Sequence, residues 1–326
     1  MKRFKMMAAV LTALAGFATQ GLAYQVGNTE CIAPANPGGG WDFTCRQVGK
    51  TLYDLKLVPG PMQVTNMAGA GGGVAYGYVI SKRGDDANLI VAASTSTTTR
   101  LAQNKYPGMN KDMVRWVAAL GADYGVIAVN KDSKFKTLAD LIAAWKQDPT
   151  QVSIAGGSAV GGWDHLKALI VAKAGGVTQL AKVKYIPFEG GGEAITQLLG
   201  GHVQAYSGDV SEIQGHLEAG DLRILAVLSE ERLPGAMAQV PTAVEQGVDA
   251  VTPNWRGFYI PKEASDDAYA YWCKAMETVY NSPEWKQIMT DNGLMPFWKQ
   301  GPAFEAFVAK QIADIHDLSK EIGLSK

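Results

Sequence analysis

The glycines of this chain gather in clusters that suit anion binding. Glycine accounts for 37 of the 326 residues, about 11% against a usual value of about 7%, and no collagen-like period explains the excess. Four clusters follow a predicted strand and precede a predicted helix, at residues 37–40, 69–73, 156–162 and 190–192. There the first helical turn has unpaired N–H groups, and the missing Cβ lets an anion reach the backbone. One such loop is usually only a turn, but four together favour a carboxylate or phosphate site at the strand carboxyl ends.

Nucleotide-binding patterns are not met. A G-x-G-x-x-G match from Gly69 fails because Val74 stands at the third glycine position, and the next strand does not end in an acidic residue. No G-x-x-x-x-G-K-[ST] occurs. We therefore expect no nucleotide and no other cofactor.

An exported serine hydrolase is the alternative from another functional class. Ser158 lies in a glycine loop, but Val160 replaces the last glycine of G-x-S-x-G. His165 follows Ser158 by seven residues on one predicted helix, so it should point away and serve in packing or capping. The remaining histidines lack metal-ligand spacing, and no metal site is predicted. They are His202, His216 and His316.

Other polar residues near predicted strand ends could meet a ligand. Residues 94–99 form a row of Ser and Thr hydroxyls, which fits a helix cap with exposed threonines equally well. Arg100 and Arg256 are basic residues near strand ends. Arg256 could enter a cleft, although a lone arginine more often forms a structural ion pair.

Short β-branched or aromatic runs alternate with helical patterns, which predicts an α/β fold that positions these loops. Strands are expected at residues 29–33, 62–66, 89–93, 114–120, 126–130, 152–155, 183–187, 203–207, 223–228 and 257–260.

Helices are predicted from apolar spacing and caps. Residues 41, 45, 48, 52 and 55 form one apolar face at steps of four and three. Thr137 and Asp140 resemble a capping box, and Ser282 precedes a proline at a first helical position. Residues 302–322 form a long amphipathic helix that closes the fold.

The N-terminal segment indicates export. Three basic residues precede the apolar run 6–18, and small residues follow at Gly21 and Ala23. This pattern predicts a signal peptide, residues 1–23, cleaved after Ala23. The apolar run is shorter than the ~20 residues that a membrane span needs.

Length and charge bound the mature protein. Subtracting 23 from 326 leaves 303 residues, more than one core usually serves, so two domains are expected. We predict residues 24–123 with 252–326 as domain I and 124–251 as domain II. The chain has 30 Lys and Arg against 31 Asp and Glu. Without the three basic residues of the signal, 27 Lys and Arg remain against 31 acidic residues, which gives the mature protein a net charge of −4. A slightly negative net charge does not favour binding to nucleic acid, so a small molecule is the better candidate partner.

Three cysteines remain in an oxidising compartment, where thiols tend to pair. Cys31 lies on a predicted strand and Cys45 near the start of the helix that folds back against it. We hypothesise a Cys31–Cys45 disulfide, which leaves Cys273 as a buried thiol.

Four ordered motifs carry a family resemblance. They are APANPGGGWD at 33–42, NMAGAGGG at 66–73, PFEGGGE at 187–193 with LLGG at 198–201, and VPTAVEQG at 240–247. Together they resemble the substrate-binding component of the tripartite tricarboxylate transporter system, the Bug family of periplasmic receptors. The two paired cysteines and residues 254–257 look most like its tricarboxylate branch.

The resemblance implies a type II periplasmic-binding-protein fold, in which two α/β domains joined by a hinge close on a ligand. A carboxylate would lie between the first glycine loop and a loop of the second domain. Trp41 and Phe43 depart from the smaller residues of many members. The implied ligand-binding residues are Gly38, Gly39, Gly40, Asp42, Asn66, Gly69, Ala70, Gly71, Ser94 and Thr95 in domain I, Gly156, Gly157, Ser158 and Asp209 in domain II, and Arg256 at the crossing.

The sequence thus predicts a monomeric periplasmic receptor rather than an enzyme. It would capture a citrate-like di- or tricarboxylate and deliver it to the subunits of a membrane permease. A sensor that uses the same closure without transport stays open beside the hydrolase that uses Ser158 and His165.

Overall fold

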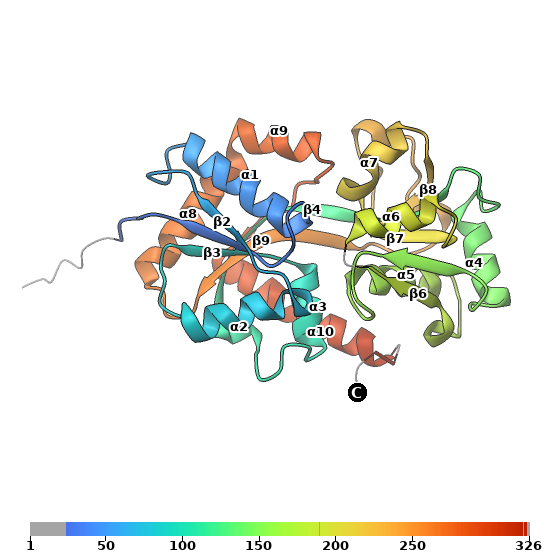
Figure 1. Ribbon diagram of the computed structural model, residues 1–326, viewed down its shortest axis with the longest axis horizontal. Helices are drawn as coiled ribbons and strands as arrows, with labels where there is room; N and C mark the ends of the chain where they lie inside the picture. The colour runs from blue at the N-terminus through green and yellow to red at the C-terminus, as the bar shows by residue number, and fades with distance from the viewer. Residues whose placement is uncertain (1–23, 189, 322, 325–326) are drawn as a thin grey trace, which may run out of the picture.

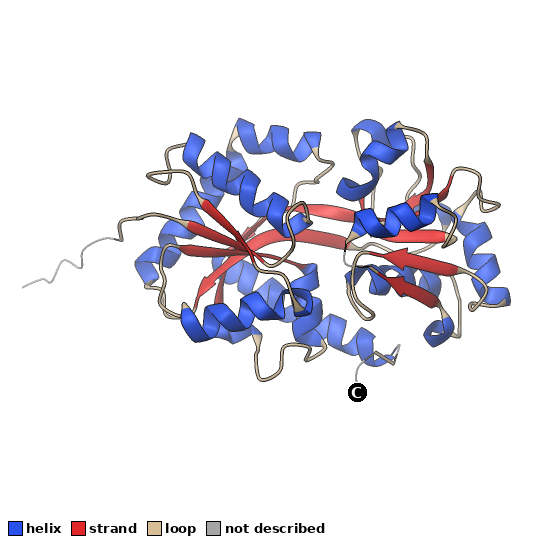
Figure 2. Cartoon of the chain, in the orientation of Figure 1, coloured by secondary structure: helices blue, strands red, loops and turns tan. Residues whose placement is uncertain are grey.

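The computed structural model describes residues 24–188, 190–321 and 323–324 (Figure 1). The predicted signal peptide and its cleavage after Ala23 lie outside these residues. Helices surround strands in two lobes that lie side by side (Figure 2). In the described part of the chain, no helix combines the length and apolar character that crossing a membrane requires.

One mixed sheet of ten strands runs through the described residues of both lobes, in the order β2-β1-β3-β9-β4-β7-β5-β6, with β8 and β10 also paired to β4. The first lobe contains β1 (Glu30–Ala33), β2 (Gln63–Asn66), β3 (Leu89–Ser94) and β10 (Lys299–Gln300). The second lobe contains β5 (Ser153–Gly156), β6 (Lys184–Pro187), β7 (Ala205–Asp209) and β8 (Leu222–Val227). In each lobe the central strands are parallel, so their carboxyl ends share an edge.

Two long antiparallel strands connect the lobes, β4 (Val114–Asn130) and β9 (Pro253–Pro261) (Figure 1). The sequence predicted two strands, at residues 114–120 and 126–130, where β4 is continuous. Pairing with β9 extends β4 through that stretch, since Ala122 lies opposite Trp255 and Asp123 opposite Asn254. The same pairing starts β9 four residues before the predicted strand.

The helices occupy the predicted intervals. They are α1 (Gly40–Asp54), α2 (Gly73–Lys82), α3 (Thr95–Ala102), α4 (Leu138–Gln147), α5 (Trp163–Ala174), α6 (Gly191–Leu199), α7 (Val210–Glu218), α8 (Asp266–Asn281), α9 (Pro283–Asp291) and α10 (Gly301–Glu321). The expected capping box of Thr137 and Asp140 opens α4, and the Ser282 hydroxyl accepts a hydrogen bond from the N–H of Trp285 in α9.

Alternation along the strands places a core on each face of the sheet. In β3, Ile90 and Ala92 pack with Trp272 under α1, α8 and α9, whereas Leu89 and Val91 pack on the opposite face toward α2 and α10. The second lobe repeats this two-sided arrangement. The rigid sheet therefore fixes where the loops at its carboxyl edge lie.

The C-terminal helix adds a third link between the lobes. Phe304 and Val308 of α10 pack in the first lobe, while Ile315 packs into the core of the second. Cys273, expected to be a buried thiol, is a free cysteine that is only partly buried. The domain boundaries at 123/124 and 251/252 stay a prediction.

Candidate functional site

A cleft of about 240 Å³ lies between the lobes at the carboxyl ends of the strands. All four glycine loops contribute to its walls. Among the predicted ligand residues, those that line it are Gly39, Gly40, Gly69, Ala70, Gly71, Ser94, Gly157, Ser158, Asp209 and Arg256. Those that do not are Gly38, Asp42, Asn66, Thr95 and Gly156.

The helices that follow the glycine loops begin without a side-chain cap. The residues before their first turns are Gly39, Gly72, Gly162 and Gly190, and none provides a capping side chain. By contrast, Ser265 and Ser282 accept hydrogen bonds from the first turns of α8 and α9, away from the cleft. Uncapped N–H groups keep their hydrogen-bonding capacity for a bound anion.

Two other glycines of these loops, Gly40 and Gly157, permit close approach of neighbouring atoms. A Cβ on Gly40 would lie 2.6 Å from Nη1 of Arg256, and one on Gly157 would lie 2.4 Å from the backbone nitrogen of Gly191. The first contact brings the start of α1 against the guanidinium from β9. The second packs two glycine loops of the second lobe together, so both cleft walls depend on the missing side chain.

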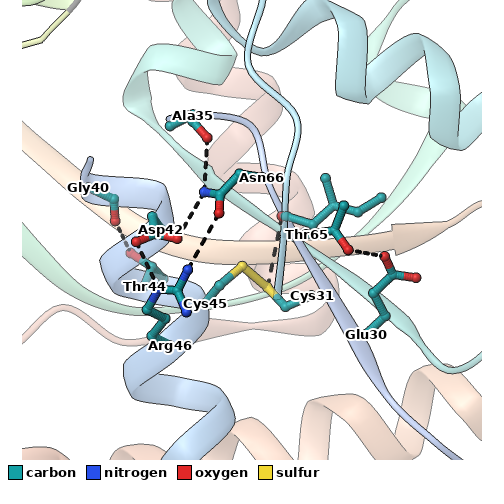
Figure 3. The surroundings of a disulfide bond; sticks show 11 residues. Glu30, Cys31, Ala35, Gly40, Asp42, Thr44, Cys45, Arg46, Thr65 and Asn66 are labelled. Atoms are coloured by element: carbon teal, nitrogen blue, oxygen red, sulfur yellow. Dashed lines mark hydrogen bonds and ion pairs between the residues drawn. A yellow bond between two sulfur atoms is a disulfide. The ribbon is translucent and has the colours of Figure 1, made fainter. Parts of the chain in front are cut away.

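Asp42 braces the first glycine loop (Figure 3). It accepts hydrogen bonds from the Gly38 N–H at 2.9 Å, from Asn66 Nδ2 at 2.9 Å and from Arg46 Nε at 2.9 Å. Burial opposes the charged form, but these hydrogen bonds lower the pKa of Asp42. Asn66 also donates to the carbonyl of Ala35 at 3.0 Å, so the loop is held from two sides.

The expected disulfide between Cys31 and Cys45 is present, with the Cα atoms 5.7 Å apart (Figure 3). It ties β1 to the first turns of α1. The loop between them, which carries Gly39 and Gly40, is therefore fixed covalently at both ends.

The hydroxyl row at the end of β3 acts mainly in capping. Ser94 lines the cleft, accepts the Ser96 N–H at 3.1 Å and accepts Trp41 Nε1 at 3.1 Å. Thr95 is buried and donates to the carbonyl of Pro253 at 3.1 Å. Ser96, outside the predicted set, also lines the cleft. The row is thus a helix cap, as one of the two interpretations held, but its threonines are buried rather than exposed.

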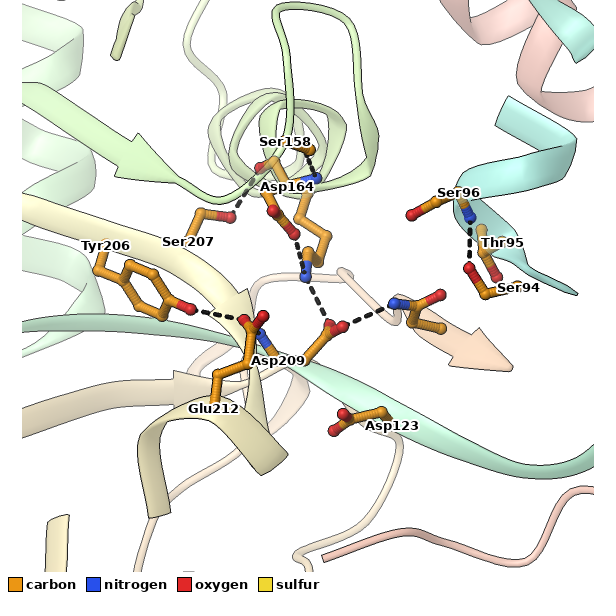
Figure 4. A network of polar contacts seen from close by, with 12 residues as sticks. Ser94, Thr95, Ser96, Asp123, Ser158, Asp164, Tyr206, Ser207, Asp209 and Glu212 are labelled. Atoms are coloured by element: carbon orange, nitrogen blue, oxygen red, sulfur yellow. Dashed lines mark hydrogen bonds and ion pairs between the residues drawn. The ribbon is translucent and has the colours of Figure 1, made fainter. Parts of the chain in front are cut away.

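The second-lobe wall carries a buried network of charges (Figure 4). Lys167, which is 0% exposed, places Nζ 2.8 Å from Asp164 and 2.6 Å from Asp209. Arg256 Nη2 lies 2.9 Å from Asp123 and 3.3 Å from Asp209. Burial, with the charge of Asp209, raises the pKa of Asp123 to about 6 against the opposing effect of Arg256. Burial also raises the pKa of Asp164, although Lys167 opposes it.

Glu212 extends the acidic side of the cleft. Its carboxylate accepts hydrogen bonds from Tyr206 Oη at 2.7 Å and from the Asp209 N–H at 3.2 Å (Figure 4). Desolvation around the carboxyl and the charges of Asp209 and Asp164 raise the pKa of Glu212, even though the residue as a whole is exposed at the cleft. Among the described residues, no group of His, Cys, Asp and Glu is arranged to hold a metal ion.

Arg100 is the basic group of the opposite wall. It lines the cleft, and a Cβ on Gly71 would lie 2.8 Å from its Nε. Its Nη1 is buried without a hydrogen-bond partner, and no ion pair links it to an acid in the part of the chain described. A cation without a counter-ion in a cleft favours an anionic ligand.

The serine hydrolase arrangement is not formed. Ser158 Oγ accepts the Asp164 N–H at 3.0 Å and lies 3.4 Å from Tyr185 Oη. His165 Nδ1 instead accepts the Gly161 N–H at 3.0 Å, the capping role expected from its spacing. Burial lowers the pKa of His165 to about 4.

Sequence reasoning missed several residues of the second wall and hinge. Two signals were present: Asp209 and Glu212 have the spacing of a capping box, and GGWD occurs at both 39–42 and 161–164. The missed residues of this wall and hinge that line the cleft are Trp163, Asp164, Phe188, Glu212 and Asn254.

Comparisons of sequence agree with one another. The pattern of the family described as tripartite tricarboxylate transporter family receptor matches residues 45–324. Protein BugT of Bordetella pertussis is 27% identical over 330 residues, which cover 99% of this chain and 98% of that relative.

Solved structures share the fold. A TctC solute-binding protein from Polaromonas is 26% identical with a TM-score of 0.69, over 90% of this chain and 98% of that one. Malate-bound MatC of Rhodopseudomonas palustris is 20% identical with a TM-score of 0.77, over 89% of this chain and 98% of that one. The predicted two-domain type II binding-protein fold is confirmed.

Proposed function

Because the chain belongs to the tripartite tricarboxylate transporter receptor family, whose members are periplasmic solute-binding receptors, we propose that it binds a citrate-like di- or tricarboxylate and delivers it to a membrane permease. The protein acts as a monomer without catalysis, after cleavage behind Ala23. Its ligand lies in the cleft between the lobes, and closure about the β4 and β9 crossings brings both walls onto it.

The observation that carries this proposal is the convergence of uncapped helix N-termini on one cleft. In both lobes the N-cap residue of the helix is a glycine, and the first-turn N–H groups that remain free, other than the Asp164 N–H bonded to Ser158 Oγ, suit carboxylate oxygens. Arg100 adds a positive charge that has no acidic partner among the described residues. Malate, which the Rhodopseudomonas palustris neighbour holds, belongs to the same chemical class.

The acidic residues of the second wall are compatible with an anionic ligand. Asp164 and Asp209 are paired with Lys167, and Asp209 also meets Arg256. The pKa of Glu212, raised to about 7, reduces its negative charge at neutral pH, and Asp123 is paired with Arg256. The ligand therefore meets a largely compensated surface rather than a free negative patch.

The first test is a thermal-shift panel on the mature protein. Citrate, isocitrate, cis-aconitate, tricarballylate, malate, succinate, glutamate and phosphate are compared at concentrations up to the millimolar range. A ligand that binds only the folded state raises the melting temperature, and the shift grows with the logarithm of the ligand concentration above the dissociation constant. Absence of stabilisation by every carboxylate contradicts the proposal.

The second test blocks the first glycine loop. In Gly39→Val we expect the dissociation constant of the best carboxylate to rise about 100-fold or more, because a branched side chain occupies the anion's approach. The backbone conformation allows the change, since φ is −77°, and a Cβ at Gly39 would lie 3.3 Å from that of Ala35, which must shift by a few tenths of an ångström.

Gly60→Val is the matched control, because a Cβ there meets nothing within 4 Å and the residue is outside the cleft. Isothermal titration calorimetry and circular dichroism of both variants separate lost binding from lost folding. Equal affinity of Gly39→Val and Gly60→Val would mean that the loop is only a turn.

A further inference from the structure

Two polar atoms on β9 lack partners beside the cleft. Asn254 and Arg256 both line it and are only 4% and 6% exposed. Two residues apart on one strand, they project to the same face. Asn254 Oδ1 and Arg256 Nε are buried without any hydrogen-bond partner. A buried polar atom without a partner lowers stability. The two atoms would therefore gain from hydrogen bonds to a polar group of a bound ligand.

Neighbouring contacts fix which atom of each side chain is left over. Asn254 Nδ2 donates to Asp209 Oδ2 at 2.6 Å, and a flipped amide would set its oxygen against that carboxylate. Its free atom is therefore an acceptor. Arg256 Nη2 donates to the same Asp209 oxygen at 3.3 Å and to Asp123 at 2.9 Å. Both side chains line the cleft and meet at one oxygen of Asp209, so the free acceptor and the free donor belong to the same part of the cleft wall.

A hydroxyl group satisfies both atoms at once. It donates one hydrogen bond, here to Asn254 Oδ1, and accepts another, here from Arg256 Nε. A carboxylate only accepts and would leave Asn254 unpaired. An ammonium only donates and would be repelled by the Arg256 guanidinium. The chemistry of the pair therefore discriminates among the substituents that a small carboxylate can carry.

We propose that Asn254 and Arg256 form a hydroxyl subsite, so that the receptor selects hydroxycarboxylates over carboxylates that lack the hydroxyl. This inference rests on the proposed function and names the substrate class of the same cleft. Asn254 supplies the acceptor, Arg256 the donor, and Asp209 holds both in place from the second lobe.

Matched ligands test the subsite directly. Citrate and tricarballylate differ only in a hydroxyl, as do malate and succinate. By calorimetry we expect the hydroxyl-bearing member of at least one pair to bind about 10- to 100-fold more tightly, since its analogue leaves Asn254 unpaired. Aspartate should bind no more tightly than succinate. Affinities within about threefold in both pairs overturn the subsite and indicate that water occupies it.

Asn254→Leu removes the acceptor at nearly constant volume. We expect the preference for the hydroxyl-bearing ligand to fall to within about threefold, while the affinity for its analogue changes little. The control is Asn130→Leu, which removes an amide bonded to the carbonyls of Leu198 and Leu199 outside the cleft and should keep the preference. A preference that survives in Asn254→Leu overturns the assignment, and if this variant does not fold, the wild-type pairs decide.

These outcomes separate the two proposals. Binding of no carboxylate contradicts the receptor function itself. Binding of carboxylates without regard to the hydroxyl leaves that function intact and removes only the subsite.

Discussion

The tetrapeptide GGWD occurs at the start of a helix on each side of the cleft, and its aspartate makes different contacts in the two copies. One copy covers Gly39 to Asp42 before and within α1, and the other covers Gly161 to Asp164 at α5. Both tryptophans line the cleft. The two aspartates diverge, because Asp42 has a lowered pKa and Asp164 a raised one.

Burial dominates at Asp164, whereas hydrogen bonds outweigh it at Asp42, and the two loops are also held through different N–H groups. In the first lobe the Gly38 N–H donates to Asp42, whereas in the second lobe the Gly161 N–H donates to His165. The position after Asp42 is a phenylalanine, which offers no acceptor. His165 holds the second loop, while Asp164 pairs with buried Lys167. An identical motif thus becomes a loop brace or part of a charge network according to its neighbours.

The two walls are consequently stabilised by different means. The first is tied by a disulfide and by hydrogen bonds to one carboxylate, with the partner Arg46 half exposed. The second depends on ions buried together. Loss of one partner should therefore have very different consequences on the two sides.

The largest expected effect on stability comes from removing the cation paired with the aspartate of each motif, Lys167 for Asp164 and Arg46 for Asp42. Lys167→Met should lower the free energy of unfolding by about 3–5 kcal/mol, because it leaves buried Asp164 without a cation and Asp209 with Arg256 alone. Arg46→Met should cost at most about 1 kcal/mol, since its side chain is 52% exposed and water replaces the ion pair. Urea unfolding of the two variants gives both values, and similar losses would remove the distinction between the walls.

The disulfide provides the next effect, confined to the first lobe. Replacing Cys31 and Cys45 together by serine should lower the free energy of unfolding by about 3 kcal/mol, because a loop of 14 residues is no longer closed in the unfolded chain. Cys273→Ser is the control, and it should cost about 1 kcal/mol or less because the thiol is only partly buried. A double variant as stable as wild type would show that hydrogen bonds alone hold the first loop.

Sequence reasoning anticipated the order of strands and helices because short alternating runs and caps are local signals. It also anticipated the glycine loops at the cleft. It did not extend the hinge strand back to Asn254, since Pro253 and Asn254 are poor strand formers. Pairing with β4 imposes that conformation, and the alternation of Asn254 and Arg256 becomes visible only then.

The second wall was difficult to predict for a related reason. Asp164 and Lys167 come from α5 and Asp209 from the end of β7, and no local pattern states that the two elements meet there. The i, i+3 spacing of Asp164 and Lys167 was a weak sign, typical of exposed helix pairs as well. Asp42 was implied by resemblance as a ligand residue, but its contacts to Gly38 and Asn66 depend on how β2 lies beside the loop.

The smallest effect we predict concerns acid sensitivity of the second loop. His165 has a folded-state pKa of about 4, below the usual 6.5, because it is buried. A depressed pKa means that the unfolded chain takes up a proton first, so stability is lost as the pH falls from about 7 toward 4. At pH 5 this loss amounts to about 2 kcal/mol relative to pH 7.5.

His165→Asn isolates this contribution, because its side-chain oxygen can still accept the Gly161 N–H while it carries no titratable group. Urea unfolding of both proteins at pH 7.5, 6 and 5 should give curves that converge on acidification, with the variant losing about 2 kcal/mol less than wild type. Asp123, whose pKa is raised to about 6, acts in the opposite direction but is present in both proteins and cancels in the difference. Parallel curves would mean that the pKa of His165 is not lowered in the folded state, and a neutral ring that accepts the Gly161 N–H would then not be what holds the second loop.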